Sequence, residues 1–144
     1  MNPEPHIKSF LDAERQSTIA LLSEFVAIPT VNPPGLAYRE FVDVVSRLLT
    51  SWKIEHRIVT VPNGDRPRYS LMAFLGGGEP GLHFHGHYDV VSAESEDQFR
   101  PVERNGRVYG RGTADMKGGI VAMLFAMRAI AQAGVKLSKA LTLM

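Results

Sequence analysis

The amino-terminal third of the chain carries two helical patterns. Apolar residues recur at intervals of three and four over residues 5–27 and again over residues 36–52. Such intervals place apolar side chains along one face of an α-helix. Pro29 is expected to end the first run, and the loop IPTVNPPG separates the two runs. We therefore predict a helix over 5–27 and a second helix over about 36–52.

The period then changes to that of β-strands. KIEHRIVTV, residues 53–61, alternates as a half-buried strand, and YSLMAFL, residues 69–75, is a short apolar strand. The turn-rich segment GGGEPG connects it to LHFHGHYDVV, residues 82–91. The short connection allows these last two strands to form a hairpin.

The carboxyl-terminal part returns to a helix. Residues 92–114 are expected to form a polar loop with a short extended piece at RVYG, and residues 116–133 a helix that stops at Gly134. This helix is apolar on nearly every side, so other structure should cover it. KALTLM then begins another strand. Helices flanking a mixed sheet predict the α/β class, and we expect residues 1–144 to be the first part of a larger domain.

Composition narrows the classes of function. The chain has 144 residues, 44% hydrophobic and 22% charged, which is typical of one globular domain. A net charge of +1, without a run of like charges, argues against nucleic acid or a membrane as partner. No secretion signal or long apolar stretch is evident, so a cytoplasmic protein is expected. Without cysteine, only His, Asp and Glu remain as metal ligands.

Candidate metal chemistry lies in LHFHGHYDVV. Its alternate positions are occupied by His83, His85, His87 and Asp89, which would share one face of a strand. Burying these groups is costly unless each has a partner. The imidazole of His87 can offer a neutral nitrogen to a cation, and the carboxylate of Asp89 can accept the other ring N–H. That second bond would fix the tautomer of His87.

A second candidate lies in GRGTADMKGG, residues 110–119. Asp115 ends a glycine-rich loop and opens the apolar helix, where its carboxylate could bridge two metal ions. Gly118 and Gly119 would let backbone segments approach closely. Each feature has a simpler explanation, since Asp115 could be a helix N-cap and GRG an ordinary turn. The combination of an HxD pair with a later helix-start aspartate favours a metal site.

These motifs resemble the zinc-dependent deacylase and carboxypeptidase family that includes acetylornithine deacetylase, succinyl-diaminopimelate desuccinylase, aminoacylase and glutamate carboxypeptidase. FVAIPTVNPPG resembles the early loop of the family, HGHYDVV its HxD metal motif and NGRVYGRGTADMKGGIVAML its bridging-aspartate motif. The resemblance implies a zinc-aminopeptidase-like catalytic domain with a mixed sheet. It also implies that His87 binds one metal ion, Asp115 bridges two, and Asp89 serves catalysis by orienting His87.

The resemblance further implies the reaction and its requirements. Two zinc ions, or cobalt in their place, would support hydrolysis of an amide bond in a small N-acyl amino acid or short peptide, and the full-length protein could form a homodimer. The family's Glu–Glu pair should follow LTLM, and the lid or dimerisation domain is absent from these 144 residues. A catalytic zinc takes three protein ligands, so we expect the isolated chain to be inactive.

Other residues are given lesser roles. The family's tryptophan after DVV has no counterpart, Ser92 follows DVV, and Gln98 precedes Phe99, which we expect to affect the substrate rather than catalysis. His85 is an alternative ligand beside His87, and His83 is expected to be a packed or hydrogen-bonded strand residue. Surface positions are expected for His6 and His56, core positions for Met116, Met123 and Met127. Lys117 could neutralise the carboxylates of the site or be solvated.

Two further functions remain open. A metal-binding or interaction module without catalysis would bind one metal ion weakly through His85, His87 and Asp89. A remnant of an interrupted gene would expose its apolar third helix and aggregate.

Overall fold

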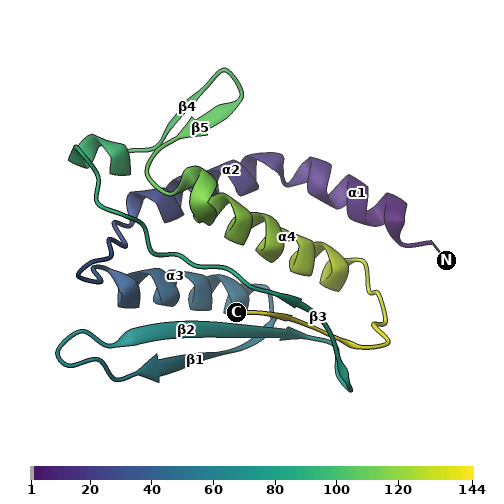
Figure 1. Ribbon diagram of the computed structural model, residues 1–144. Coiled ribbons are helices and arrows are strands. Elements are labelled where there is room, and N and C mark those ends of the chain that lie inside the picture. Colours follow the sequence, from purple (N-terminus) through teal and green to yellow (C-terminus); the bar gives the residue numbers. More distant parts are fainter. Residues whose placement is uncertain (1) are drawn as a thin grey trace.

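The computed structural model describes residues 2–144, and it has the predicted α/β class. The α-helices are α1 (Glu4–Ala13), α2 (Arg15–Ala27), α3 (Tyr38–Ser51) and α4 (Gly118–Gln132), and the strands are β1 (Glu55–Val61), β2 (Arg68–Leu75), β3 (Pro80–Phe84), β4 (Val102–Arg104), β5 (Arg107–Tyr109) and β6 (Ala140–Leu143) (Figure 1). A short 3-10 helix spans Glu96–Phe99, and a π-type turn spans Thr113–Lys117.

A four-stranded mixed sheet has the order β1-β2-β6-β3. β1 pairs antiparallel with β2, β2 antiparallel with β6, and β6 parallel with β3. The expected hairpin of residues 69–75 with residues 82–91 is therefore wrong, because β6 lies between these strands. β6 reaches this place through α4, the usual kind of connection between parallel strands. Leu141 and Leu143 of β6 are buried there.

The helices cover one another and the sheet in layers. α3 contacts β1 and β2, α4 contacts β6, and both α1 and α2 contact α4 (Figure 1). The core joins these elements, and six residues of α4 are buried in it: Ile120, Val121, Leu124, Phe125, Met127 and Ala129. The apolar helix predicted over residues 116–133, which is α4, is thus covered as expected. It is not the exposed helix that an aggregating remnant requires. Met127 is fully buried and Met123 packs against the core, whereas Met116 is only half-buried.

The predicted helix over residues 5–27 is two helices. The break falls at Glu14, whose φ of −88° and ψ of 9° interrupt the helical path between α1 and α2. The carboxylate of Glu14 is paired there with the guanidinium of Arg128 on α4 at 3.2 Å. The prediction of one helix bridged residues 12–18, which contain no large apolar residue, and so it missed the break that falls within them.

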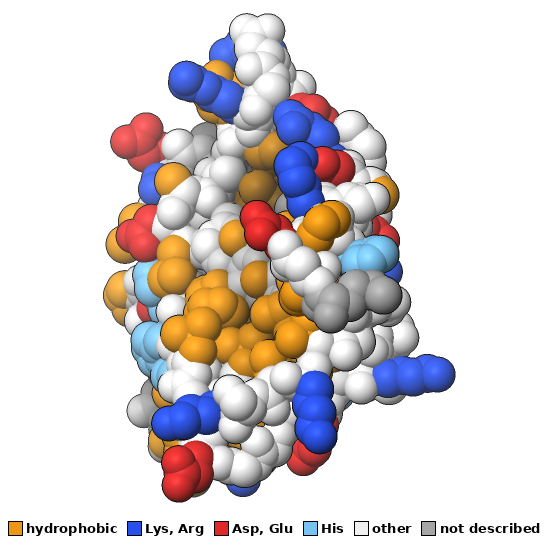
Figure 2. Space-filling view, turned by 90° about the vertical axis from the view of Figure 1, so that its right-hand side faces the viewer, with side chains coloured by type: hydrophobic (Ala, Val, Ile, Leu, Met, Phe, Trp, Pro, Cys, Tyr) orange, Lys and Arg blue, Asp and Glu red, His pale blue; other side chains and the backbone are white. Residues whose placement is uncertain are grey.

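The surface carries charges of both signs. Figure 2 shows one face on which hydrophobic side chains gather near the centre and charged side chains of both signs lie around them. None of the helices in residues 2–144 is long and apolar enough to cross a membrane.

Candidate metal centre

The histidine-rich segment only begins as a strand. β3 ends at Phe84, and residues 85–89 continue as an irregular extended connection. The four candidates therefore do not share one strand face as predicted. His83 lies in β3, and its Nδ1 is 2.7 Å from the hydroxyl of Thr142 on β6. His87 and Asp89 lie beyond the strand, where residue 90 forms a β-bridge with residue 31.

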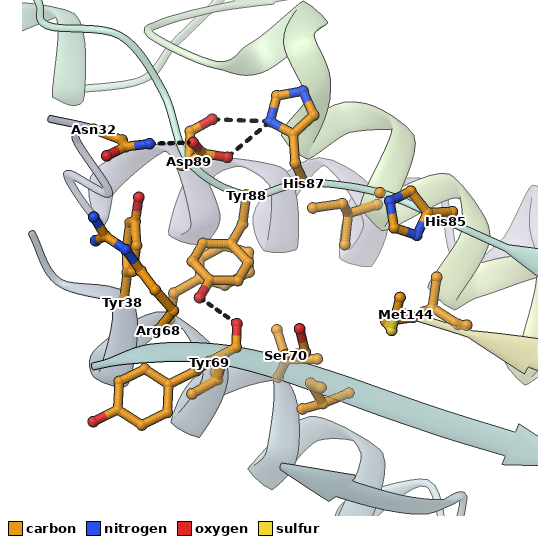
Figure 3. A pocket seen from close by; sticks show the side chains of 17 residues that line it. Asn32, Tyr38, Arg68, Tyr69, Ser70, His85, His87, Tyr88, Asp89 and Met144 are labelled. Atoms are coloured by element: carbon orange, nitrogen blue, oxygen red, sulfur yellow. Dashed lines mark hydrogen bonds and ion pairs between the residues drawn. The ribbon is translucent and has the colours of Figure 1, made fainter. Parts of the chain in front are cut away.

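The structure brings His87, Asp89 and Asp115 together. Nδ1 of the His87 imidazole lies 3.2 Å from Oδ1 of Asp89 and 3.1 Å from its carbonyl oxygen (Figure 3). Nε2 of the same ring lies 3.0 Å from Oδ1 of Asp115. Each ring nitrogen thus faces a different carboxylate, so one imidazole links the two sequence motifs.

These contacts change the acidity of the imidazole. Burial opposes the charged form, but the hydrogen bond to Asp115, the backbone of Asp89 and the charges of both carboxylates together raise the pKa of His87. The two carboxylates thus favour the charged imidazolium form, in which Nε2 also carries a proton. A metal ion at Nε2 would have to displace that proton.

Asp115 lies in the turn before α4. The helix begins at Gly118 rather than at residue 116, and Asp115 has φ −128° and ψ 98°, which are not helical. No side-chain cap is formed at the start of α4, so Asp115 is not a helix N-cap. Its side chain is 87% exposed and its Oδ1 faces His87. The carboxylate is therefore free to accept a cation on its exposed side.

Of the two glycines that follow, only Gly118 is closely packed against backbone. A Cβ atom at residue 118 would lie 2.6 Å from the carbonyl oxygen of Thr113, far inside van der Waals contact. A Cβ at Gly119 would meet only the flexible end of Met116, at 3.2 Å. The predicted need for a close backbone approach therefore applies to Gly118.

We expect Gly118→Ala to destabilise the chain by about 1–3 kcal/mol, the usual cost of overpacking. The direction of the change in the free energy of unfolding is informative, because alanine in a helix normally stabilises by about 1 kcal/mol relative to glycine. Urea unfolding followed by circular dichroism measures the change. Gly77→Ala is the control, since no heavy atom lies within 4 Å of its Cβ position. A Gly118→Ala variant as stable as Gly77→Ala would contradict the assigned close approach.

Sequence reasoning missed Asn32. Its side-chain amide donates to Oδ2 of Asp89 at 3.0 Å, and its backbone N–H donates to the carbonyl of Val90 at 2.8 Å (Figure 3). Asn32 thus holds the carboxylate that faces His87. The only signal in the sequence was its place in the loop VNPPG, which contains no metal-ligand pattern.

Both predicted roles of Lys117 are wrong. Its side chain is fully buried, and Nζ donates to the carbonyl oxygens of Phe25, at 2.9 Å, and Ile28, at 2.7 Å. It is neither solvated nor paired with a carboxylate of the site. Burial lowers the pKa of Lys117 to about 8.

The remaining candidates lie apart from this cluster. His85 is exposed, and its ring lies 6.2 Å from that of His83. His6 is exposed as predicted, but His56 is half-buried, between the hydroxyl of Ser46 at 2.7 Å and the carbonyl of Ile54 at 2.9 Å. Within residues 2–144, no group of three or more His, Asp or Glu side chains forms a ready metal site.

Gln98 has a visible structural contact. Its side-chain oxygen accepts from Nη2 of Arg111 at 2.9 Å, and its carbonyl accepts from the backbone N–H of Arg111 at 2.7 Å. Gln98 therefore anchors the start of the glycine-rich loop, whereas Ser92 is exposed. Any effect of Gln98 on substrate would pass through this loop.

A cavity of about 290 Å³ opens beside His87. It lies beyond the end of β6, between residues 68–71 of β2 and residues 85–89 (Figure 3). The hydroxyl of Tyr88 donates across it to the carbonyl of Tyr69 at 2.7 Å. The lining from α3 is aromatic and apolar: Tyr38, Phe41, Val42 and Val45. Its size and lining suit a small, partly apolar molecule.

Comparisons with known proteins show which proteins this chain resembles. Residues 83–144 match the sequence profile of peptidase family M20/M25/M40. A probable succinyl-diaminopimelate desuccinylase of Staphylococcus epidermidis is 38% identical over 117 residues, which cover 78% of this chain and 27% of that protein. The succinyl-diaminopimelate desuccinylase of Bordetella petrii is 37% identical over 118 residues, covering 76% and 28%.

Solved structures show the same fold. Human carnosine dipeptidase 1 superimposes with a TM-score of 0.79 at 22% identity, covering 99% of this chain and 34% of that one. An M20 family metallo-carboxypeptidase of Sulfolobus solfataricus gives a TM-score of 0.72 at 21% identity, covering 88% and 29%. The chain is therefore related to the M20 peptidases and desuccinylases, and the family resemblance predicted from the sequence is confirmed. It spans about a quarter of the length of the curated relatives it matches.

Proposed function

We propose that this chain supplies His87 and Asp115 to a dizinc centre that hydrolyses an amide bond in a small N-acyl amino acid or short peptide. The observation that carries the proposal is the contact of 3.0 Å between Nε2 of His87 and Oδ1 of Asp115, which lie 28 residues apart in the sequence. The match to the M20 family and the relatives named as desuccinylases support the reaction class.

The residues present fit zinc. Imidazole nitrogen and carboxylate oxygen are common zinc ligands, and a third group usually holds the far nitrogen of a ligating histidine. Asp89 occupies that outer position at Nδ1 of His87. The side chains of His87 and Asp115 are 48% and 87% exposed, so an ion can reach both from solvent. Cobalt would suit the same ligands.

The chain's own residues would each have one task. In the metal-bound state, His87 would keep its Nδ1 proton on Asp89 and would offer Nε2 to one ion, and the carboxylate of Asp115 would help to hold both ions. When bound at these residues, zinc would supply an activated water near neutral pH and would polarise the scissile carbonyl.

We further propose that residues 1–144 form the amino-terminal portion of a catalytic domain and do not complete its site. His87 and Asp115 are two ligands, whereas a catalytic zinc normally takes three from the protein. Among the described residues, no glutamate lines the cavity beside His87 as a general base. The 144-residue chain is therefore expected to be inactive by itself.

Zinc titration of the purified chain by calorimetry tests the metal assignment, with His87→Ala measured beside it. We expect saturable uptake that a chelator reverses and that His87→Ala loses. Uptake that is absent, or unchanged by this substitution, would contradict the proposal. A parallel assay with N-acetyl and N-succinyl amino acids and dipeptides should detect no zinc-dependent hydrolysis. Reproducible hydrolysis of one of these substrates by the chain would refute the proposal that its site is incomplete. If Asp115→Ala abolished that hydrolysis, the assignment of Asp115 as a ligand would still be supported.

A further inference from the structure

The fully buried polar residues in the described part of the chain are Thr30 and Lys117. Thr30 lies in residues 25–32, and Lys117 contacts this segment, which comprises the end of α2 and the loop after it. We call this segment the platform. Thr30 belongs to the platform, and its hydroxyl donates to the carbonyl of Tyr88. Lys117 reaches the platform from the turn that carries Asp115.

On one side the platform holds the HxD segment. The backbone N–H of Val90 donates to the carbonyl of Thr30 at 2.9 Å, and that of Asn32 donates to the carbonyl of Val90 at 2.8 Å. The amide of Asn32 binds the carboxylate of Asp89. The position of His87 relative to the platform is thereby restrained at the three residues that follow it, Tyr88, Asp89 and Val90.

On the other side the platform holds the turn of Asp115. Nζ of Lys117 donates to the carbonyls of Phe25 and Ile28, and it lies 5.6 Å from the ring centre of Phe41. The backbone N–H of Lys117 donates back to the carbonyl of Gly112 at 2.9 Å, which closes the turn. Lys117 therefore ties the turn to the same platform that holds Asp89.

We propose that Lys117 is a positioning residue, which fixes Asp115 relative to His87 by anchoring the turn Thr113–Lys117 to the carboxyl end of α2. The inference rests on the proposed metal centre. Burying an ammonium group is costly even when it is hydrogen-bonded, and an apolar side chain of similar length would avoid that cost. The buried ammonium group instead fixes a position, because the two carbonyl acceptors determine where the end of the Lys117 side chain lies.

A simpler role must be separated from this one. A cation near the last carbonyls of a helix stabilises that helix, so the simpler role for Lys117 is to stabilise α2 alone. In that case its loss would lower stability without changing the geometry between Asp115 and His87. A test therefore needs a readout that responds to this geometry and not to stability.

The experiment compares Lys117→Met, which keeps the length and removes the donors, with Lys117→Arg, which keeps both charge and donors. Val121→Ala is the matched control, because Val121 is buried in α4, the helix that follows the turn, and does not line the cavity beside His87. All three are measured at a temperature at which they are folded. The readouts are zinc affinity by calorimetry and the visible absorption spectrum of the cobalt-loaded chain.

We expect Lys117→Met to weaken zinc binding by about 10-fold or more, the lower range for losing a group that orients a ligand, and to change the cobalt spectrum. Lys117→Arg should keep most of the zinc affinity of the unsubstituted chain. Val121→Ala should leave the zinc affinity and the cobalt spectrum unchanged, even if its melting temperature falls as far as that of Lys117→Met. Unchanged affinity and spectrum in Lys117→Met would overturn the proposal. If Lys117→Met does not fold, Lys117→Gln is judged by the same readouts.

The metal assignment and the role of Lys117 can fail separately. If the unsubstituted chain takes up no zinc, the proposed function fails, and a crystal structure of metal-free Lys117→Met decides the role of Lys117. The contact between His87 and Asp115 should then be lost. Its retention at the present 3.0 Å would overturn the positioning role.

Discussion

Replacing Asp115 with alanine is expected to lower the zinc affinity of the chain by about 100-fold or more, and His87→Ala should do the same. The expectation follows from the number of ligands. Loss of a group that only orients a ligand costs about 10–100-fold in metal affinity, so loss of one of two direct ligands should cost at least the upper value. Calorimetric titration with zinc measures both variants.

The same variants should change stability little. The side chains of His87 and Asp115 are 48% and 87% exposed, and surface substitutions usually stay within about 0.5 kcal/mol. His6→Ala and Asp65→Ala are matched controls, because each removes an exposed group of the same kind elsewhere. Asp89→Asn should give a smaller loss of affinity, since Asp89 faces the ring nitrogen away from Asp115. Equal affinities in Asp115→Ala and Asp65→Ala would refute the assignment of Asp115.

The free energy of unfolding is expected to rise by about 2 kcal/mol between pH 7 and pH 9.5 because of Lys117. Burial lowers the pKa of Lys117 from its ordinary value of 10.5 to about 8 in the folded chain. Between these two values the unfolded chain binds the proton and the folded chain does not, so raising the pH favours folding. Below about pH 8 both states are protonated, and the cost of the buried charge is fully present.

Urea unfolding at several pH values measures this rise, and Lys117→Met is the control because it has no group to titrate. The series should stop near pH 9.5, since burial raises the pKa of Tyr88 and tyrosine ionisation in the unfolded chain would begin to oppose the effect. The difference in slope between the two proteins isolates Lys117. Parallel slopes would show that Lys117 keeps its ordinary pKa.

Much of the local structure followed from the sequence pattern. The second helix was expected over about 36–52 and is α3, Tyr38–Ser51, because its apolar stripe faces one side throughout. The alternation in residues 53–61 became β1, with half-buried and exposed residues in turn over its first half. The order of strands was not predictable in the same way. β2 and β3 do not pair with each other because β6 lies between them, although 55 residues separate β6 from β3 in the sequence.

The site likewise contains some residues that the sequence pattern revealed and others that it did not. Its motifs were visible because His87, Asp89 and Asp115 are chemically unusual among apolar and glycine-rich neighbours. The groups that place them were not visible. Asn32 and Lys117 lie 57 and 92 residues from the partners that they bind, Asp89 and Phe25, and neither residue forms part of a ligand pattern.

The sequence by itself predicted the class of fold, the family resemblance and the candidate ligands, because periodicity, motifs and ligand chemistry are properties of short segments. Only the tertiary structure decided that β6 separates β2 from β3, that α4 starts after Asp115, and that a buried lysine joins the turn to α2. The physical reason is that these outcomes depend on which distant groups share the interior. There, each polar group must find a partner, and the fold decides which partners lie within reach.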